Sequence, residues 1–242
     1  MKIKTTWFLA SVLAALAAGA APAADPAPVA GAGLRIAIVG DSTVCDYPAA
    51  SPCRGWGQFV QERFQSSVAV TNLACSGRST KTFRKEGRWR NTLAAKPDFV
   101  LIQFGHNDSH GAGRPEATDA AGDFREYLRQ YVDEARAAGA TPILVTPMCR
   151  RNFGADGKLQ DILAPYAEAM KAVAAEKKAP VIDLYAASVR LTESMGPARA
   201  PEFASTDKDR THFNEKGARA MAEIVLKELP RAEPRLGARM RP

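Results

Sequence analysis

The sequence has few of the residues that build metal and redox sites. Three histidines and four cysteines occur in 242 residues. No Cys-x-x-Cys, His-Glu-x-x-His or EF-hand pattern is present, which leaves zinc-ribbon, thiol-redox, zinc-protease and calcium-loop functions without support. His106 and His110 would supply only two ligands, and we interpret them as residues of a polar loop. We therefore expect no metal ion and no cofactor.

Motifs of nucleotide-binding enzymes and of α/β-hydrolases are also missing. Gly31-Ala32-Gly33 precedes the first apolar run, whereas the glycines of a Rossmann site follow the first strand. No P-loop occurs, and neither does the Gly-x-Ser-x-Gly turn that carries the nucleophile of α/β-hydrolases. These absences disfavour nucleotide chemistry and the α/β-hydrolase fold.

The strongly apolar stretch near the beginning is shorter than the ~20 residues that a membrane-spanning helix needs. It runs from Trp7 to Leu16, follows Lys2 and Lys4, and precedes Ala21-Pro22-Ala23, a small-x-small cleavage pattern. These features are typical of a secretory signal peptide, so we expect a secreted or periplasmic protein without a membrane anchor. The predicted organisation is a signal peptide at 1–23, a flexible lead-in at 24–33, one domain at 34–230 and a solvated basic tail at 231–242.

Export into an oxidising compartment allows the four cysteines to pair, with three connectivities open. We favour a bond between Cys45 and Cys53, because they bracket a proline-rich loop that a disulfide would rigidify. Cys75 and Cys149 are then expected to be free and buried.

Short apolar runs alternate with longer segments of helical spacing, such as the one containing Trp56, Phe59, Val60 and Phe64. Alternation of this kind is typical of a parallel sheet, because each parallel connection needs a crossover of helix length. We predict an α/β fold, a three-layer α/β/α sandwich, with a final helix at Glu215–Leu229. The predicted strands are Leu34–Val39, Val68–Leu73, Phe99–Phe104, Pro142–Val145 and Pro180–Leu184.

Polar motifs follow the predicted strands, at the sheet edge where open α/β folds bind ligands. Each motif alone is typical of a turn or a helix cap. They are Gly40-Asp41-Ser42-Thr43 after the first strand, Gly77 after the second, Gly105-His106-Asn107-Asp108 after the third, and Asp209-Arg210-Thr211-His212 before the final helix.

Together these motifs supply the parts that acyl transfer requires. Ser42 is a candidate nucleophile, His212 a base for its proton, and Asp209 a carboxylate that orients the imidazole. Backbone N–H groups at Ser42 and Gly77 and the amide of Asn107 are candidate donors to an oxyanion. The conjunction favours a hydrolase.

The four motifs resemble the blocks of the SGNH (GDSL-type) hydrolases, in the order of that family and across residues 34 to about 229. The resemblance implies a flavodoxin-like fold with a five-stranded parallel sheet. It also implies a catalytic triad of Ser42, Asp209 and His212 and an oxyanion hole of Ser42, Gly77 and Asn107. His106 is expected to line the site without catalysing.

Additional motifs are similar to those of rhamnogalacturonan acetylesterases, which remove acetyl groups from pectin. The loop between Cys45 and Cys53 departs from that group, and it adjoins Ser42. The motifs are Gly55-Trp56-Gly57, Gly77-Arg78-Ser79, Thr146-Pro147-Met148, Arg150-Arg151 with Phe153, and His212-Phe213.

The formal charge of +7 is concentrated near the candidate site. Residues 78–90 contain six basic side chains against Glu86 alone, and Arg150-Arg151 follows the fourth predicted strand. A cationic rim beside an esterase site would attract a polymer that contains galacturonate. We expect a monomer that acts on an acetylated acidic polysaccharide and does not bind nucleic acid; the candidate substrate-binding residues are Arg78, Lys81, Arg84, Arg150 and Arg151.

Two alternative functions stay open. A lipase or lysophospholipase could use the same triad, although it would need an apolar acyl groove. A polysaccharide- or nucleic acid-binding protein could use the basic stretch as a contact surface without any chemistry. Trp56 and Phe153 likewise have two interpretations, either as aromatic rings that stack on a sugar or as core residues.

Overall fold

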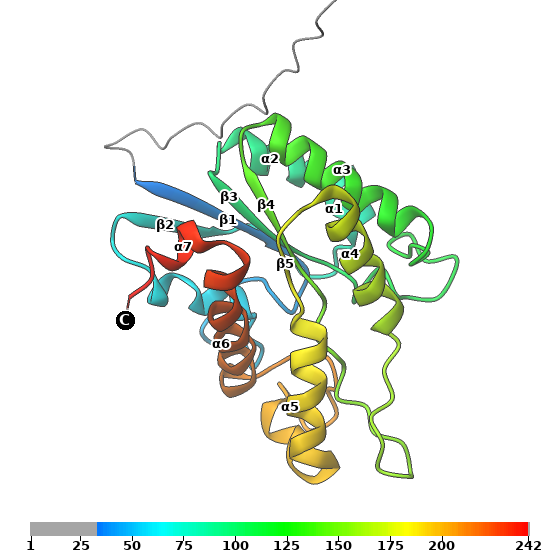
Figure 1. Cartoon of the computed structure of the whole chain (residues 1–242). Coiled ribbons are helices and arrows are strands. Elements are labelled where there is room, and N and C mark those ends of the chain that lie inside the picture. The colour runs from blue at the N-terminus through cyan, green and yellow to red at the C-terminus, as the bar shows by residue number, and fades with distance from the viewer. Residues whose placement is uncertain (1–32, 242) are drawn as a thin grey trace, which may run out of the picture. The chain divides into compact units, whose positions relative to one another are not determined.

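A computed structural model describes residues 33–241, so the predicted signal peptide and nearly all of the predicted lead-in lie outside the described residues. The described residues form a five-stranded parallel sheet in the order β2-β1-β3-β4-β5 (Figure 1). This sheet confirms the predicted fold, and each strand coincides with one of the predicted apolar runs. The strands are β1 (Leu34–Gly40), β2 (Val68–Asn72), β3 (Phe99–Gln103), β4 (Thr141–Val145) and β5 (Val181–Ile182).

Helices cover both faces of the sheet and complete the predicted three layers (Figure 1). One face packs against α1 to α4, and the other packs against α5, α6, α7 and three short 3-10 helices. The helices are α1 (Thr80–Lys85), α2 (Arg88–Ala94), α3 (Asp123–Ala137), α4 (Ala164–Lys177), α5 (Leu184–Arg199), α6 (Glu215–Ala232) and α7 (Pro234–Gly237); the 3-10 helices are Trp56–Phe59, Gln61–Arg63 and Ala200–Phe203. Among the described helices, none is long and apolar enough to cross a membrane.

The central strands are apolar throughout because both of their faces are buried. Ile36 and Ile38 of β1 point into one core, and Ala37 and Val39 point into the other. β1 lies between β2 and β3, so the strand order reverses at β1. A ligand crevice is expected outside the carboxyl ends of the strands at such a reversal.

The segment with helical spacing after the first strand forms two 3-10 helices in place of one α-helix. Close packing is the local reason, since a Cβ on Gly57 would lie 2.6 Å from both Asn72 Nδ2 and Val44 O. Trp56 is fully buried, and its indole N–H donates to Gln103 Oε1 at 2.7 Å. Trp56 is therefore a core residue and not a sugar-stacking platform. Phe153 is half-buried and pairs with Leu159 in a β-bridge.

The predicted solvated tail is wrong for the described residues 231–241. Leu236 of α7 is fully buried in the core beside α6. Met240 forms an antiparallel bridge with Phe64, and Arg241 N donates to Arg63 O at 2.8 Å. Two apolar side chains and backbone hydrogen bonds therefore hold this segment against the domain.

Replacing Leu236 with alanine is expected to lower the free energy of unfolding by about 2–5 kcal/mol, because a buried leucine leaves a cavity. Urea denaturation of the described domain measures this change. The exposed Arg231→Ala is the control and is expected to stay within about 0.5 kcal/mol of wild type. Equal stabilities for the two variants would contradict the packing of α7.

Candidate active site

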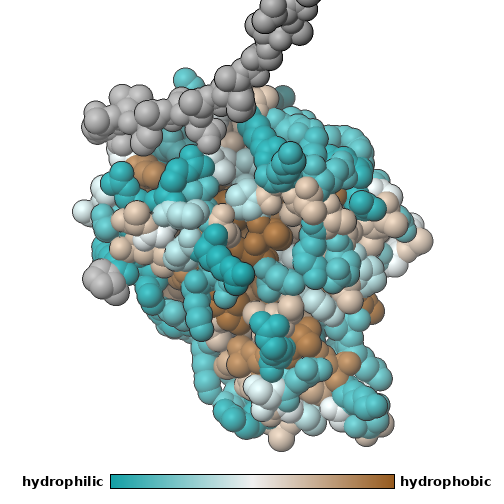
Figure 2. Space-filling model, in the orientation of Figure 1, coloured by the Kyte–Doolittle hydropathy of each residue, from teal (hydrophilic) through white to brown (hydrophobic). Residues whose placement is uncertain are grey.

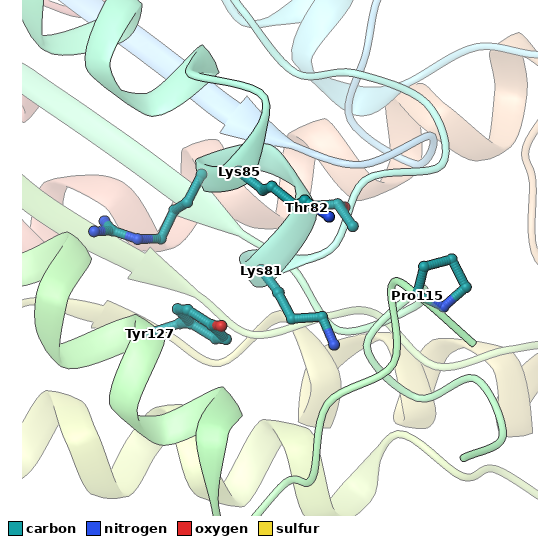
Figure 3. A pocket seen from close by; sticks show the side chains of 6 residues that line it. Lys81, Thr82, Lys85, Pro115 and Tyr127 are labelled. Carbon is teal, nitrogen blue, oxygen red and sulfur yellow. The ribbon is translucent and has the colours of Figure 1, made fainter. Parts of the chain in front are cut away.

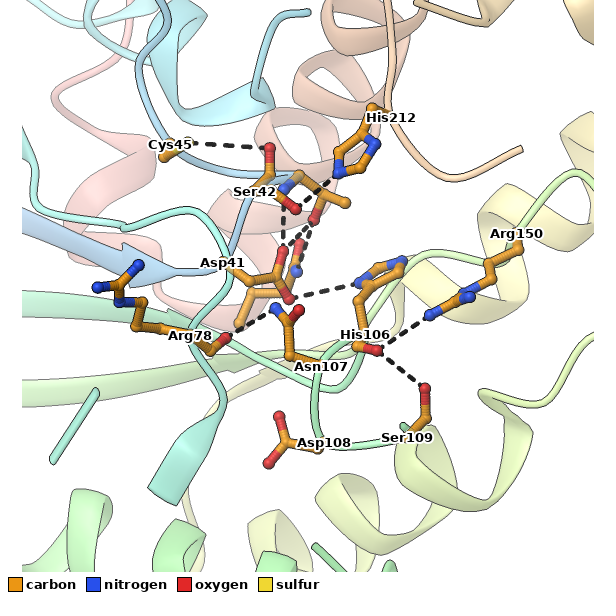
Figure 4. A network of polar contacts seen from close by, with 12 residues as sticks. Asp41, Ser42, Cys45, Arg78, His106, Asn107, Asp108, Ser109, Arg150 and His212 are labelled. Carbon is orange, nitrogen blue, oxygen red and sulfur yellow. Dashed lines mark hydrogen bonds and ion pairs between the residues drawn. The ribbon is translucent and has the colours of Figure 1, made fainter. Parts of the chain in front are cut away.

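The turn after β1 presents Ser42 at the carboxyl edge of the sheet (Figure 4). Asp41 fixes this turn, because its Oδ1 accepts hydrogen bonds from Thr43 N at 2.9 Å and from Thr43 Oγ1 at 2.7 Å. Gln103 Nε2 donates in turn to Thr43 Oγ1 at 3.0 Å. The side chains behind Ser42 are thus held by a buried chain of hydrogen bonds.

The loop before α6 brings the predicted base to Ser42. His212 Nε2 lies 2.9 Å from Ser42 Oγ, although the two residues are 170 positions apart in the chain. His212 Nδ1 lies 2.9 Å from Asp209 Oδ2. The structure therefore joins the hydroxyl, the imidazole and the carboxylate in one hydrogen-bonded line, as the sequence motifs predict.

Asp209 is surrounded by hydrogen-bond donors. Its Oδ1 accepts from the backbone N–H groups of Thr211 at 2.7 Å and His212 at 2.8 Å, and its Oδ2 accepts from Ser205 Oγ at 2.9 Å. Burial acts to raise the pKa of Asp209, but these donors outweigh it and lower the pKa to about 2. Asp209 is therefore a carboxylate near neutral pH. Ser205 belongs to no recognisable motif, so the sequence does not predict its contact with Asp209.

Arg151 supports the loop that carries His212 and does not form part of a substrate rim. Its side chain is buried, and its guanidinium lies 4.3 Å from the centre of the Phe213 ring. Nη2 donates to the carbonyl of His212 at 2.7 Å, and the backbone N–H donates to Arg210 O at 2.8 Å. This burial contradicts the predicted role of Arg151 in substrate binding, because the side chain contacts the inner side of the loop that carries His212.

Two further loops bring the predicted oxyanion donors to the same edge. Gly77 is exposed with φ +79°, and a Cβ there would meet nothing within 4 Å, so its backbone is open to a ligand. Asn107 donates one amide N–H to Arg78 O at 3.0 Å, which ties the β3 loop to the β2 loop. A side-chain amide has two N–H donors, so one is left for a ligand. Within residues 33–241 the N–H groups of Ser42 and Gly77 have no hydrogen-bond acceptor.

Asp108, for which the sequence predicts no role, joins the loop of Asn107 to α1 through hydrogen bonds. Its fully buried carboxyl accepts from Thr80 N at 3.1 Å and Thr118 Oγ1 at 3.0 Å, and it also accepts from Thr80 Oγ1. Burial raises the pKa of Asp108 to about 7, even though the threonine donors act to lower it. These hydrogen bonds hold the first turn of α1 beside the predicted oxyanion donors.

His106 lies behind the turn of Ser42, where it is almost fully buried. Its Nδ1 lies 3.4 Å from Asp41 Oδ2 (Figure 4). Burial acts to raise the pKa of Asp41, but His106 and Thr43 outweigh it and leave the pKa below its usual value. His106 O accepts from Arg150 Nη2 at 3.0 Å, so the guanidinium of Arg150 is tied to the β3 loop. Among the described residues, His106 thus faces Asp41 and forms no hydrogen bond to Ser42 Oγ or to the ring of His212.

Part of the predicted basic rim is already paired with carboxylates. Arg78 Nε donates to both carboxylate oxygens of Glu86, at 3.1 and 3.0 Å. Arg84 makes two hydrogen bonds to Glu134 of α3, at 3.0 and 2.7 Å. The sequence could not show these partners of Arg84, because α3 comes about 50 residues later. Lys81 keeps its charge without a carboxylate partner among the described residues and donates to Ala117 O at 2.9 Å.

The predicted disulfide between Cys45 and Cys53 is absent, and the four cysteines are free thiols. Cys45 is buried with its Sγ 3.9 Å from Ser42 O, and burial raises the pKa of its thiol to about 11. A guanidinium organises the loop instead: Arg54 donates to Ser51 O and Cys53 O at 2.7 Å and to Ala49 O at 2.9 Å. Cys75 is half-buried and Cys149 is buried.

Residues 38–220 match the GDSL-like Lipase/Acylhydrolase family. The chain belongs to this family. It is accordingly a carboxylic ester hydrolase, as the sequence motifs predict. The SGNH resemblance seen in the motifs is thereby confirmed.

Individual members of the family resemble the chain over most of its length. It is 38% identical to rhamnogalacturonan acetylesterase RhgT of Bacillus subtilis, a match that covers 79% of this chain and 88% of that protein. The crystal structure of YxiM of Bacillus subtilis is 31% identical with a TM-score of 0.72, covering 82% of this chain and 56% of that one. The structure of Axe2, an acetylxylan esterase from Geobacillus stearothermophilus, shares the fold at 22% identity and a TM-score of 0.64, covering 82% and 95%.

Proposed function

We propose that this ester hydrolase is a serine acetylesterase that removes acetyl groups from an acidic, pectic polysaccharide. The observation that supports the catalytic part is the hydrogen-bonded line from Ser42 Oγ through His212 to Asp209. Beside it lie the backbone N–H groups of Ser42 and Gly77, which have no acceptor within the described part of the chain. The names of relatives such as RhgT support acetyl as the acyl group and rhamnogalacturonan as the polymer.

The geometry supports a two-step acyl transfer. In the first step Ser42 Oγ attacks the acetyl carbonyl while His212 Nε2 accepts its proton, and Asp209 stabilises the imidazolium. The N–H groups of Ser42 and Gly77 and the amide of Asn107 stabilise the tetrahedral oxyanion. His212 then protonates the departing sugar oxygen, which leaves an acetyl-enzyme and a free sugar hydroxyl.

In the second step a water molecule attacks the acetyl-enzyme. His212 removes a proton from that water, and a second tetrahedral oxyanion forms among the same donors. Its collapse releases acetate and returns the proton to Ser42. Both half-reactions use one base and one set of donors, so no additional acid or cofactor is required.

A comparison of substrates tests this proposal. Acetate release is measured with acetylated rhamnogalacturonan, acetylated homogalacturonan and acetylated xylan, together with short-chain and long-chain p-nitrophenyl esters. We expect the highest kcat/KM among the polymers on rhamnogalacturonan, and among the esters on the acetyl ester. Preference for the long-chain ester would point to a lipase, and preference for xylan would overturn the pectic assignment.

Salt is expected to weaken the reaction on the polymer but not on a neutral ester. Exposed charges more than about 10 Å apart are largely screened at 0.1 M salt, so attraction between the basic surface and a polyuronate declines as salt is added. We expect KM for acetylated rhamnogalacturonan to rise between 10 and 500 mM NaCl, with KM for p-nitrophenyl acetate nearly constant. Equal changes on both substrates would mean that the basic surface has no part in binding.

We also propose that the protein is exported, on the basis of the signal-like segment at residues 1–23. A pectic polysaccharide lies outside the cytoplasm, so this localisation agrees with the proposed substrate. Mass spectrometry of the protein recovered from cells and medium tests it, with cleavage near Ala23 as the expected result.

A further inference from the structure

A basic groove lies beside α1 (Figure 3), and neither Ser42 nor His212 is among its lining residues. It has a volume of about 470 Å³ and is formed by α1, by the loop after β3 and by α3. Three of its six lining residues are cationic and none is acidic. The lining residues are Lys81, Thr82, Arg84, Lys85, Pro115 and Tyr127.

The two lysines of the groove have charges that no carboxylate matches. Arg84 is paired with Glu134, but neither Lys81 nor Lys85 forms an ion pair among the described residues. Lys81 donates to Ala117 O at 2.9 Å, which fixes its ammonium in the groove and leaves further N–H donors available. Lys85 is exposed one turn further along α1. The pair presents compact positive charges that accept a carboxylate in many orientations.

The remaining lining suits a sugar ring. Tyr127 is half-buried and Pro115 is exposed, so both offer apolar ring surfaces beside the ammonium groups. Figure 3 shows Lys81 extending between these two rings. A few charged groups set among apolar surfaces are the usual composition of a small-molecule site.

The helix that forms the groove is joined to the loops of the candidate active site. α1 begins at Thr80, which Asp108 holds against the loop of Asn107. Lys81 follows Gly77 by four residues, so their Cα atoms lie at most about 15 Å apart. A polymer with its acetyl group at Ser42 can therefore reach the groove with a neighbouring part of its chain.

We propose that this groove is a secondary substrate subsite, which binds the carboxylate of a uronate residue in the same polysaccharide chain that presents its acetyl group to Ser42. The proposal rests on the proposed function, because it assumes a polymeric acidic substrate. Arg78, Arg84 and Arg151 of the predicted rim form hydrogen bonds to partners within the protein. The proposed subsite therefore assigns the binding of the substrate carboxylate to Lys81 and Lys85.

Substitution of both lysines tests the subsite. In the double variant Lys81→Gln, Lys85→Gln we expect KM for acetylated rhamnogalacturonan at low salt to rise about three- to tenfold, the size expected for the loss of two exposed ion pairs. We expect kcat on the polymer, and kcat/KM on neutral acetylated xylo-oligosaccharides and on p-nitrophenyl acetate, to stay at wild-type values. The rise in KM should disappear in 500 mM NaCl.

A matched control removes the same charge elsewhere. Lys96 precedes β3 and Lys227 lies in the second half of α6, so both lie toward the sheet edge opposite the catalytic loops. The double variant Lys96→Gln, Lys227→Gln is expected to keep wild-type KM on every substrate. An equal rise in KM for the two double variants would show a general effect of net charge and would overturn the subsite. Equal losses on neutral and acidic substrates would overturn it as well.

A binding measurement separates the subsite from the proposed function. Affinity electrophoresis in gels containing deacetylated polygalacturonate requires no turnover. We expect the Ser42→Ala variant to be retarded, and the addition of Lys81→Gln and Lys85→Gln to abolish the retardation. Retardation that the lysine substitutions leave unchanged would overturn the subsite even if the enzyme hydrolyses pectin. A different outcome would overturn only the proposed function. If the lysine substitutions abolish the retardation but wild type releases no acetate from pectin, the groove is a polyuronate-binding site of a protein that is not a pectin acetylesterase.

Discussion

Replacing Ser42 with alanine is expected to reduce the turnover of acetyl esters by about 10⁴- to 10⁶-fold, the range seen when a triad nucleophile is removed. The hydroxyl that forms the acyl-enzyme is lost, whereas the backbone N–H of residue 42 and the turn fixed by Asp41 are kept. The fold should therefore persist. Release of p-nitrophenol from p-nitrophenyl acetate, alongside circular dichroism spectra, measures both properties.

The matched control is Ser194→Ala, a serine on α5 whose hydroxyl donates only to Leu191 O. It is expected to keep wild-type turnover. Mass spectrometry after treatment with an organophosphorus serine reagent provides a second readout, because wild type should gain one adduct on Ser42 and the Ser42→Ala variant none. Substantial turnover by Ser42→Ala, or an adduct on another serine, would remove Ser42 from the nucleophile position.

Replacing Asn107 with alanine is expected to lower kcat by about 10²- to 10³-fold, which is the usual loss when one oxyanion donor is removed. KM should change little, because the charge that the amide stabilises develops only in the transition state. The change also removes the hydrogen bond to Arg78 O, so the thermal unfolding midpoint has to be compared with that of wild type.

Asn91→Ala, at an exposed position of α2, is the control for Asn107 and is expected to leave both kcat and KM unchanged. A second measurement uses a boronic acid that forms a tetrahedral adduct with serine. Its affinity should fall with kcat in Asn107→Ala if the amide binds the oxyanion. Unchanged kcat in a folded Asn107→Ala variant would show that the amide does not contribute.

The sequence predicted the sheet and the central site because both depend on local patterns. Strands buried on two faces appear as unbroken apolar runs, and parallel strands place the residues that follow them at one edge. For this reason the sequence alone places Ser42, Asn107 and the Asp209 to His212 motif at one edge of the sheet. The structure brings Ser42, His212 and Asp209 together at hydrogen-bonding distances, and it places the amide of Asn107 at the same edge, where it donates to Arg78 O.

The features of the structure that the sequence does not predict depend on contacts between distant segments. Arg151 and Arg84 look like free surface charges in the sequence, but Phe213 and Glu134 approach them only in the folded chain. Ser205 has no motif of its own, and its contact with Asp209 depends on the path of the loop. The arginines of residues 231–242 predicted a solvated tail, whereas the burial of Leu236 packs this segment against the domain.

Phe213 follows His212 in the chain and forms antiparallel β-bridges with Arg54 and with Ala204. Arg54 belongs to the segment that follows the nucleophile, so the first and last parts of the domain meet at this point. In the proposed mechanism, a growing polypeptide that has not yet reached residue 212 carries Ser42 without its proton acceptor. A chain truncated before residue 212 would therefore lack esterase activity.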